Sequence, residues 1–509
     1  MKVLLMHRDR DFDAAAELPA NEADVAQDLE LGTLIAAMAG GDQFLYGVAR
    51  TAIQLGLRDP ATIRYRQDVL TDCLACPDVV RELYALAGEG LDAEKKVRLG
   101  WLRDTPESLL RGSVQVLEIL VDVLRRLRRT AGAHAGDFRS EGWTTLGAML
   151  AAELDDAYLA TVEAHLEGLK FRGGTLMSAR LGKGGRGADH VVRTPRERGL
   201  VERITAAGGR GTHTFRIADR DESGFRALAE LRGRGIHSVA TALAQSTDHI
   251  LGFFTALRTE LGFYVGCLNL HDRLSSKGGH VCFPDPLPTG SPGLSARDLY
   301  DPCLTLHLEG RAVGNDVDAE GRALVIVTGA NQGGKSTFLR SVGVAQLMLE
   351  SGMFVAAESL RASVSSGVFT HYRREEDAAM ESGKLDEELA RMSAIADAIR
   401  PGGLLLCNES FAATNEREGA EIARQVVRAL VERGIAVIFV THLYDLAHGL
   451  SIDPPVPARF LRAQRGSGGE RPYRIEEGEP LPTSFGEDSY RRVFGTELGG
   501  DPAAASEGR

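Results

Sequence analysis

A glycine-rich stretch between an apolar segment and a helical pattern is the part of the chain best suited to chemistry. Leu324 to Val327 reads as a buried strand and Phe338 to Leu349 as an amphipathic helix. The residues between them fit G-x-x-x-x-G-K-[ST], a phosphate-binding loop in which main-chain N–H groups close around phosphate oxygens. An isolated match can be an ordinary loop, but this strand and helix favour the functional interpretation. The predicted nucleotide-binding residues are Gly329, Ala330, Asn331, Gln332, Gly333, Gly334, Lys335, Ser336 and Thr337.

A second apolar segment ends in polar residues of the kind that ATP hydrolysis needs. Gly402 to Cys407 reads as a buried parallel strand, and Asn408 and Glu409 follow it. In ATPases with such a loop, a pair of carboxylates at a strand end holds Mg²⁺ and polarises the attacking water. Glu409 is the predicted general base. Asn408 stands where an aspartate is expected and brings no charge, so we expect weaker Mg²⁺ affinity or slower turnover.

A third apolar segment, Ala436 to Val440, ends in Thr441 and His442. A histidine at the carboxyl edge of a parallel sheet is well placed to sense the γ-phosphate of ATP. A lone histidine is more often structural, but here it follows the loop and Glu409 in a consistent order. We therefore predict a doubly wound α/β ATPase domain. Its catalytic residues would be Lys335, Glu409 and His442, and Ser336 and Asn408 would hold Mg²⁺.

The overall composition is that of a globular protein in a reducing compartment. The chain has 509 residues, 43% of them hydrophobic, a net charge of -12 and six scattered cysteines. This charge argues against nucleic-acid binding over the whole surface, and the cysteines do not form a secreted disulfide framework. Cys73 and Cys76 are spaced like metal or redox ligands, but no second pair accompanies them, and we assign no metal there. With no signal peptide or membrane-length apolar run in view, we expect a cytoplasmic location.

Periodicity and composition divide the chain into segments and predict a multidomain fold. An α-helical region is followed by the α/β ATPase domain. Residues 117–124 show the spacing of a buried helix face, and Ile250, Phe254, Leu257, Leu261, Tyr264 and Leu268 mark a long packed helix. The predicted segments are a variable lead-in over 1–28, a helical core over 29–170, a basic and partly β segment over 171–235, a long helix over 236–280, the ATPase domain over 281–498 and a disordered tail over 499–509.

The basic segment is the best candidate for contact with nucleic-acid phosphates. Residues 172–216 contain ten lysines and arginines against three acidic residues, which would attract a phosphate backbone. Strand-like pieces flank it at Gly174 to Leu181 and His213 to Ile217. A mobile charged loop explains the composition equally well. The candidate DNA-binding residues are Arg180, Lys183, Arg186, Arg193 and Arg196.

These motifs together resemble the MutS family of DNA mismatch repair ATPases. The stretch TGANQGGKST at 328–337 is similar to the family's TGPNMGGKST, and NESFAATNEREG at 408–419 has the frame of DExGRGTSTxDG. Thr441-His442 and the residues after it resemble THYFEL. Phe369-Thr370 and Ser382-Gly383-Lys384 are similar to the family's I-F-T-R and A-S-G-R. The resemblance is specific over about 300–450 and fainter over the helical core.

The resemblance implies an ABC-type ATPase domain that uses ATP and Mg²⁺ and forms a homodimer. Ser382 and Gly383 would reach the nucleotide of the neighbouring subunit. The long helix would act as a lever to a DNA clamp, and the basic segment would be a shortened clamp. The sequence departs from the family at Phe411-Ala412-Ala413, where the pattern has G-R-G, and after Lys384, where it has S-T-F. No Phe-x-Glu motif occurs in the first 150 residues, so we do not expect a mismatch-reading domain, and no Smr-type nuclease tail is visible.

The favoured hypothesis is therefore a homodimeric Mg-ATPase that controls binding to mismatched or structured DNA in repair or recombination. The alternative is an ATP-gated protein that couples to another protein and binds no DNA, as the acidic balance and the lack of a mismatch reader suggest. A P-loop kinase for a small molecule is more remote, because no acceptor site or lid is recognisable. The DNA structure, the pathway, any repair-protein partner and the stability of the dimer without ATP do not follow from the sequence.

Overall fold

The chain folds into two compact units. The structure is a computed structural model that describes residues 1–98, 105–172, 174–185, 187–193, 216–290, 292–374, 383–466 and 470–482. The first unit consists of Met1–Leu4, Asp78–Arg139 and Trp143–Leu261, and the second of Leu5–Pro77, Ser140–Gly142 and Gly262–Arg509. Residues 5–77 thus fold with the C-terminal part of the chain, so the predicted helical core over 29–170 is divided between the two units.

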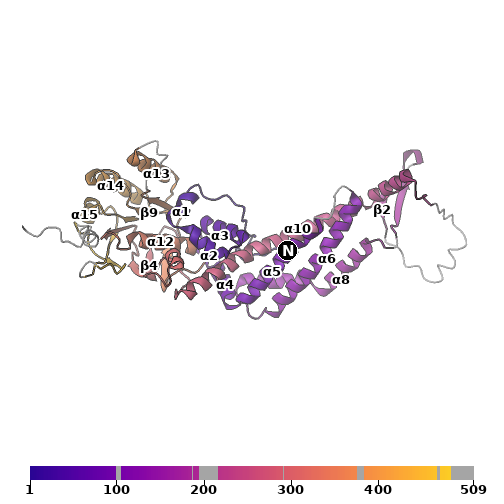
Figure 1. Ribbon diagram of the computed structural model, residues 1–509, viewed down its shortest axis with the longest axis horizontal. Coiled ribbons are helices and arrows are strands. Elements are labelled where there is room, and N and C mark those ends of the chain that lie inside the picture. Colours follow the sequence, from indigo (N-terminus) through magenta and orange to yellow (C-terminus); the bar gives the residue numbers. More distant parts are fainter. Residues whose placement is uncertain are drawn as a thin grey trace, which may run out of the picture. The chain divides into compact units, whose positions relative to one another are not determined.

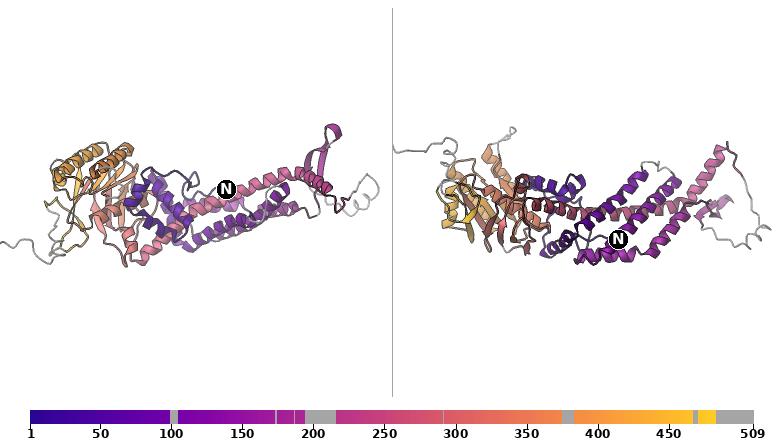
Figure 2. Two further views of the ribbon diagram at one scale, coloured as in Figure 1. Left: turned by 45° about the horizontal axis from the view of Figure 1, so that its top comes forward. Right: turned by 60° about the horizontal axis from the view of Figure 1, so that its bottom comes forward.

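Helices form the body of the first unit. Thr105 begins one of them with a capping box, in which its hydroxyl accepts from the backbone N–H of Ser108 and the Ser108 hydroxyl accepts from that of Thr105. The predicted buried face of this helix is confirmed, since Leu117, Leu120 and Leu124 are all buried. Helices α5, α6 and α8 run beside α10 (Figures 1 and 2). The helices are α5 (Pro77–Arg98), α6 (Pro106–Ala133), α7 (Glu141–Glu153), α8 (Asp156–Leu169) and α10 (Glu222–Ser276), whose last part belongs to the second unit.

Helix α10 is a continuous rod of 55 residues. Its predicted packed face is confirmed, because Phe254, Leu257, Leu261, Tyr264 and Leu268 are buried and Ile250 is half-buried. The helix begins at Glu222, well before the predicted start at 236. Residues 222–235 are therefore helical and do not belong to a β excursion.

A small hairpin occupies part of the basic segment. Strands β1 (Met177–Leu181) and β2 (Gly187–Val192) pair antiparallel around a short 3₁₀ turn, η1 (Lys183–Gly185). The first predicted strand is confirmed, but the described end of the second, 216–217, is not a strand. The strand that pairs with β1 is instead β2, which was a poor strand candidate from the sequence because it contains a glycine and an aspartate. The hairpin packs on α10, where the Met177 sulfur lies directly over Gly235.

Residues Leu5 and Met6, which fall in the predicted variable lead-in, are part of the second unit's core. Leu5 and Met6 are fully buried, and the Tyr264 hydroxyl donates to the Leu5 carbonyl oxygen over 2.6 Å. The helices of this unit are α1 (Glu22–Asp28), α2 (Leu31–Ala39), α3 (Gln43–Leu55), α4 (Pro60–Ala75), α11 (Pro302–His307), α12 (Lys335–Glu350), α13 (Lys384–Ala398), α14 (Glu416–Glu432) and α15 (Tyr444–Ile452).

Two sheets complete the second unit, and the larger one carries the predicted chemical residues. Its order is β12-β11-β6-β10-β9-β8, with β12 antiparallel to its neighbour and the other strands parallel. The three apolar segments predicted as strands are confirmed as β6, β9 and β10. The strands are β6 (Leu324–Gly329), β8 (Val368–Tyr372), β9 (Leu404–Asn408), β10 (Ala436–Val440), β11 (Ala458–Ala463) and β12 (Ile475–Glu477). The smaller sheet has the order β3-β7-β4-β5, from β3 (Asp285–Leu287), β7 (Ser359–Ser363), β4 (Leu294–Leu299) and β5 (Asn315–Asp318).

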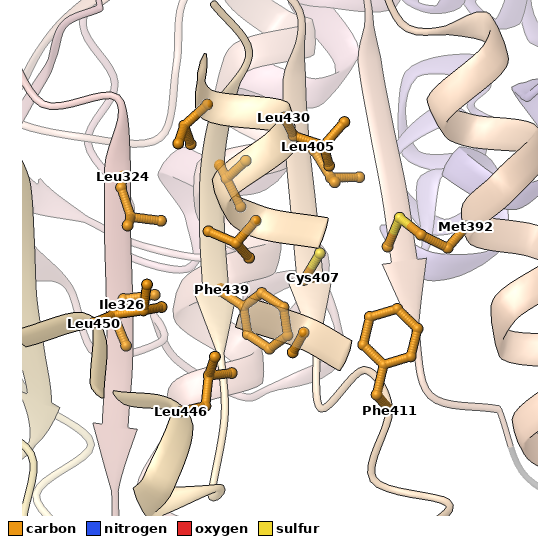
Figure 3. Close-up of a cluster of buried hydrophobic side chains, with 14 of the residues drawn as sticks. Leu324, Ile326, Met392, Leu405, Cys407, Phe411, Leu430, Phe439, Leu446 and Leu450 are labelled. Carbon is orange, nitrogen blue, oxygen red and sulfur yellow. The ribbon is translucent and has the colours of Figure 1, made fainter. Parts of the chain in front are cut away.

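The large sheet is buried on both faces, as the apolar runs of its central strands require. On one face Cys407 and Phe439 belong to a cluster with residues of α13, α14 and α15 (Figure 3). On the other face Leu406 meets α12, where a Cβ on Gly343 would lie 2.6 Å from the Leu406 Cδ1. Period-two alternation therefore divides the sheet residues between two helix layers, and the parallel register places the carboxyl ends of the central strands at a common edge.

None of the described helices combines the length and apolarity needed to span a bilayer. All six cysteines are free thiols, and Cys73 lies buried in α4. Within the described ranges, no group of three or more His, Cys, Asp or Glu side chains is arranged to hold a metal ion.

Candidate active site

The loop between β6 and α12 adopts a backbone that requires glycine. Gly329 and Gly334 have φ values of 108° and 91°, in the left-handed region that side chains resist. At Gly333 an added Cβ would lie 2.7 Å from the Cβ of Ala463 in β11. The loop is thus pressed against the neighbouring strand. Helix α12 starts directly after it, so the positive end of the helix dipole lies at the same place.

Lys335 lies inside this loop and is only 5% exposed. Its Nζ donates to the carbonyl oxygens of Gly329 and Ala330 over 3.0 and 3.1 Å. Burial lowers the pKa of Lys335, and the nearby Glu409 carboxylate opposes this change. The ammonium group is therefore held at the mouth of the loop, where an anion would meet it.

The second residue of α12 meets the end of β9. The Ser336 hydroxyl donates to the side-chain oxygen of Asn408 over 2.9 Å. Two oxygen atoms of the type that Mg²⁺ prefers are thus adjacent at the carboxyl edge of the sheet. Asn408 fits this pair without a charge, because its amide oxygen accepts the same hydrogen bond that an aspartate would accept.

Glu409 and His442 follow the neighbouring strands β9 and β10 and approach each other. Glu409 Oε1 lies 3.9 Å from His442 Nδ1. The pKa of Glu409 is lowered, mainly by His442 and with contributions from Lys335 and Arg373. Glu409 is therefore ionised at neutral pH and can accept a proton or orient a water molecule.

A cavity of about 940 Å³ joins these residues. Asn331 to Thr337, Glu409 and His442 all line it, so residues predicted from three separate segments meet in one space. Gly329 and Ala330 contribute through their carbonyl contacts to Lys335, and Asn408 through Ser336. The cavity is large enough for a nucleotide.

Several residues of the cavity wall were missed by the sequence analysis. Leu304, Leu308 and Val313 form an apolar side, and Asn315, Tyr473, Arg311 and Arg373 add polar groups. Arg373 follows the end of β8 just as Glu409 follows β9, so the strand-end pattern could have identified it. No spacing in the sequence links Leu304 or Tyr473 to the loop, because they reach it only through the fold.

Other predicted residues lie elsewhere or outside the described residues. Gly383 is the N-cap of α13 and is not among the cavity's lining residues, and Ser382 lies outside the described residues. Arg180, Lys183 and Arg193 belong to the hairpin of the first unit, where all three are exposed. Arg186 and Arg196 also lie outside the described residues.

A buried histidine, His371, contacts the residues that directly follow Glu409. His371 Nδ1 lies 2.7 Å from the Ser410 hydroxyl, and its Nε2 faces the Glu388 carbonyl oxygen at 3.0 Å. The ring also stacks on Phe411 with centroids 5.5 Å apart. The Nε2 hydrogen points at a carbonyl oxygen, and the Ser410 hydroxyl also lies 2.7 Å from the His371 carbonyl oxygen, to which it donates. This network joins β8 to the loop that carries Glu409.

We expect this histidine to make the stability of the protein depend on pH. Burial lowers the pKa of His371 to about 4 from 6.5. Below pH 6.5 the unfolded chain takes up a proton that the folded chain does not, so stability is lost as the pH falls from 6.5 toward 4. The loss reaches up to about 3 kcal/mol in that window. Urea unfolding of wild-type protein and of His371→Gln at several pH values measures it.

The difference between the two proteins isolates His371 from the other titrating groups. The variant should be less stable at pH 7.5 and should lose less stability than wild type on acidification. Parallel pH profiles for the two proteins would contradict the assignment.

Comparisons with known proteins agree with this architecture. A family model described as the MutS2 N-terminal domain matches residues 58–277, and one described as MutS domain V matches residues 325–468. The second match contains the loop, β9 and β10, together with Glu409 and His442.

Individual relatives match over part of their length. The chain is 36% identical over 263 residues to a protein named Endonuclease MutS2 from Anaeromyxobacter sp., covering 48% of this chain and 31% of that protein. It is 29% identical over 184 residues to the DNA mismatch repair protein MutS of Chloroflexus aurantiacus, covering 33% and 19%. It is 27% identical over 201 residues to the human MutS protein homolog 4, covering 38% and 22%. The matches thus span less than a third of each of these relatives. With two MutS domain models matched in their order along the chain, the protein belongs to the MutS family.

Proposed function

We propose that this protein binds and hydrolyses ATP with Mg²⁺ and uses the nucleotide state to control its binding to mismatched or structured DNA, in repair or recombination. The observation that carries the ATPase part is the cavity in which the loop, Ser336, Glu409 and His442 meet. Membership of the MutS family supports the DNA part, because relatives of the chain carry DNA mismatch repair in their names.

Each residue has a role that its position supports. The loop N–H groups and Lys335 would neutralise the β- and γ-phosphates, and Ser336 and Asn408 would hold Mg²⁺, directly or through water. The metal would supply charge neutralisation at the phosphates when bound. Glu409 would accept a proton from the attacking water. His442, 3.9 Å from Glu409, would respond to the γ-phosphate.

The proposal extends to the oligomeric state and the location of the protein. ATP would draw two copies of the chain together through their ATPase domains, with Ser382 and Gly383 contacting the partner's nucleotide. The cytoplasm would be the site of action.

Steady-state ATP turnover tests the proposal. The purified protein is assayed alone and with matched duplex, mismatched duplex, branched and single-stranded DNA at two salt concentrations. A salt-sensitive change with one class of DNA would support DNA coupling and identify the substrate. Turnover that ignores every DNA, together with no DNA retention, would favour the alternative, an ATP-gated ATPase that couples to another protein. No turnover under any condition would contradict the ATPase part.

The exposed hairpin leads to a prediction about how DNA binding depends on the salt concentration. Arg180 and Lys183 are exposed beside a surface that includes Leu181, which is 85% exposed. If both bind phosphates, the double variant Arg180→Gln/Lys183→Gln should bind duplex DNA more weakly. The slope of log K against log[salt] should fall by about 0.9 for each phosphate that is no longer neutralised. Filter binding at four salt concentrations measures the slope.

The matched control removes two charges from exposed arginines of the second unit. Arg400→Gln/Arg433→Gln changes the net charge equally, and both side chains are exposed. Equal slopes for the hairpin variant and this control would contradict a role for the hairpin.

A further inference from the structure

Arg373 lies at the same edge of the large sheet as Asn408 and Glu409. Strands β8, β9 and β10 run parallel with Tyr372, Asn408 and Val440 in register. The backbone N–H of Arg373 then donates to the Asn408 carbonyl oxygen over 2.9 Å, and that of Glu409 donates to the Val440 carbonyl oxygen over 2.9 Å. Arg373 and Glu409 therefore leave the sheet side by side at the same edge.

Arg373 lines the same cavity as Lys335, Glu409 and His442. Within the described parts of the chain, its side chain has no ion pair or hydrogen bond. Two other arginines nearby already form ion pairs with carboxylates. Arg311, which lines the cavity, pairs with Asp298 at 2.5 Å, and Arg374, the next residue, pairs with Asp24. Among the residues that the structure describes, Arg373 thus offers a fork of N–H donors without a partner beside the predicted general base.

The charges around the cavity favour an anionic ligand at this position. Glu409 is the only carboxylate among the cavity's described lining residues, whereas Lys335, Arg311 and Arg373 are cationic. Asn408 removes the negative charge that an aspartate would bring to the strand end. A nucleoside triphosphate would add several negative charges, and with Glu409 as the general base its outermost phosphate would be the one nearest to Glu409.

We propose that Arg373 binds the terminal phosphate of ATP and thereby makes the cavity prefer ATP to ADP. The inference rests on the proposed ATPase function and assigns a further phosphate-binding residue to it. A guanidinium can donate two parallel hydrogen bonds to phosphate oxygens, which a lysine can match only in charge. ADP has no phosphate at this position, so it gains nothing from Arg373.

Binding of ADP and of AMPPNP, a non-hydrolysable ATP analogue, tests the inference by calorimetry with Mg²⁺ present. Arg373→Gln should weaken AMPPNP binding about 10- to 100-fold, the usual loss for hydrogen bonds to a charged group. ADP binding should change less than about twofold. Arg373→Lys should restore part of the AMPPNP affinity. Arg400→Gln, an exposed arginine before β9, is the control and should bind both nucleotides like wild type.

The outcomes separate this inference from the proposed function. Unchanged AMPPNP binding by Arg373→Gln would overturn the inference while the ATPase proposal stands. Equal weakening of both nucleotides would overturn it as well, because a structural role does not distinguish them. Wild-type protein that binds neither nucleotide would overturn the proposed function and this inference with it.

Discussion

Glu409→Gln is expected to lower the steady-state rate of ATP hydrolysis by at least about 100-fold and to leave ATP affinity within about twofold of wild type. Glutamine keeps the size of the side chain, so the cavity is preserved. A neutral amide cannot accept the proton of the attacking water. The pKa of Glu409 is lowered, chiefly by His442, so the wild-type carboxylate is already in the basic form at neutral pH.

Single-turnover hydrolysis and equilibrium ATP binding separate the two effects. Glu358→Gln removes one negative charge from an exposed residue before β7 and is the matched control. The control should retain both binding and turnover. If Glu409→Gln keeps full turnover, Glu409 is not the general base. If it loses ATP affinity as strongly as turnover, its role is in binding.

The central part of the candidate site was predictable because its signals are local in the sequence. Each of the three segments that carry it is a short apolar run followed directly by polar residues. Parallel strands end at a common edge, so Ser336, Asn408 and Glu409 meet once the strands pair. The close approach of the loop to Ala463 could not be predicted from the sequence. The glycines that permit this approach were recognisable as part of the motif.

The rest of the site depends on contacts between distant segments. Leu304 reaches the cavity from α11, and Tyr473 reaches it beside β12. Neither residue type is unusual enough to signal a site on its own. Burial of Leu5 and Met6 was likewise missed, because the polar residues after them masked a short apolar run at the start of the chain.

Phe411 illustrates how the fold accommodates a departure from the family pattern. It occupies the first position of the family's G-R-G stretch and has a φ of 64°, a value that favours glycine. The left-handed conformation costs about 1–2 kcal/mol for other residues. Phe411 is fully buried and stacks on His371, and burial of an aromatic ring can offset that cost. Gly419 lies directly against the Phe411 carbonyl oxygen, so a side chain there would displace the loop.

The largest effect on stability is expected from Asp301→Ala. The Asp301 side chain has no exposed surface, and it accepts a hydrogen bond from Arg340 Nε over 2.5 Å. Its other oxygen caps α11 by accepting from the Leu304 N–H over 3.0 Å. Burial raises the pKa of Asp301, and the Arg340 guanidinium opposes this. Removing the buried carboxylate leaves the largely buried Arg340 guanidinium with only the exposed Glu30 as a partner, and loss of a buried partner costs about 3–5 kcal/mol.

Urea unfolding of the full chain measures this loss, and Glu30→Gln is its control. Glu30 also pairs with Arg340, but its side chain is 45% exposed. Loss of that partner should cost at most about 1 kcal/mol, as for other exposed pairs. Equal losses for the two variants would contradict a special role for the buried carboxylate.

A third variant, Asp301→Asn, separates the charge of this side chain from its capping role. The amide oxygen of the new asparagine would still accept from the Leu304 N–H, so helix α11 keeps its cap, but Arg340 loses its buried countercharge. Most of the destabilisation of Asp301→Ala should therefore appear in Asp301→Asn, with about 1 kcal/mol more for the lost cap. Leu304 and Leu308 line the cavity from this segment, and Arg340 follows Ser336 by about one turn of α12. If the cap positions the cavity wall, Asp301→Ala should weaken ATP binding more than Asp301→Asn, and equal affinities would assign the pair to stability alone.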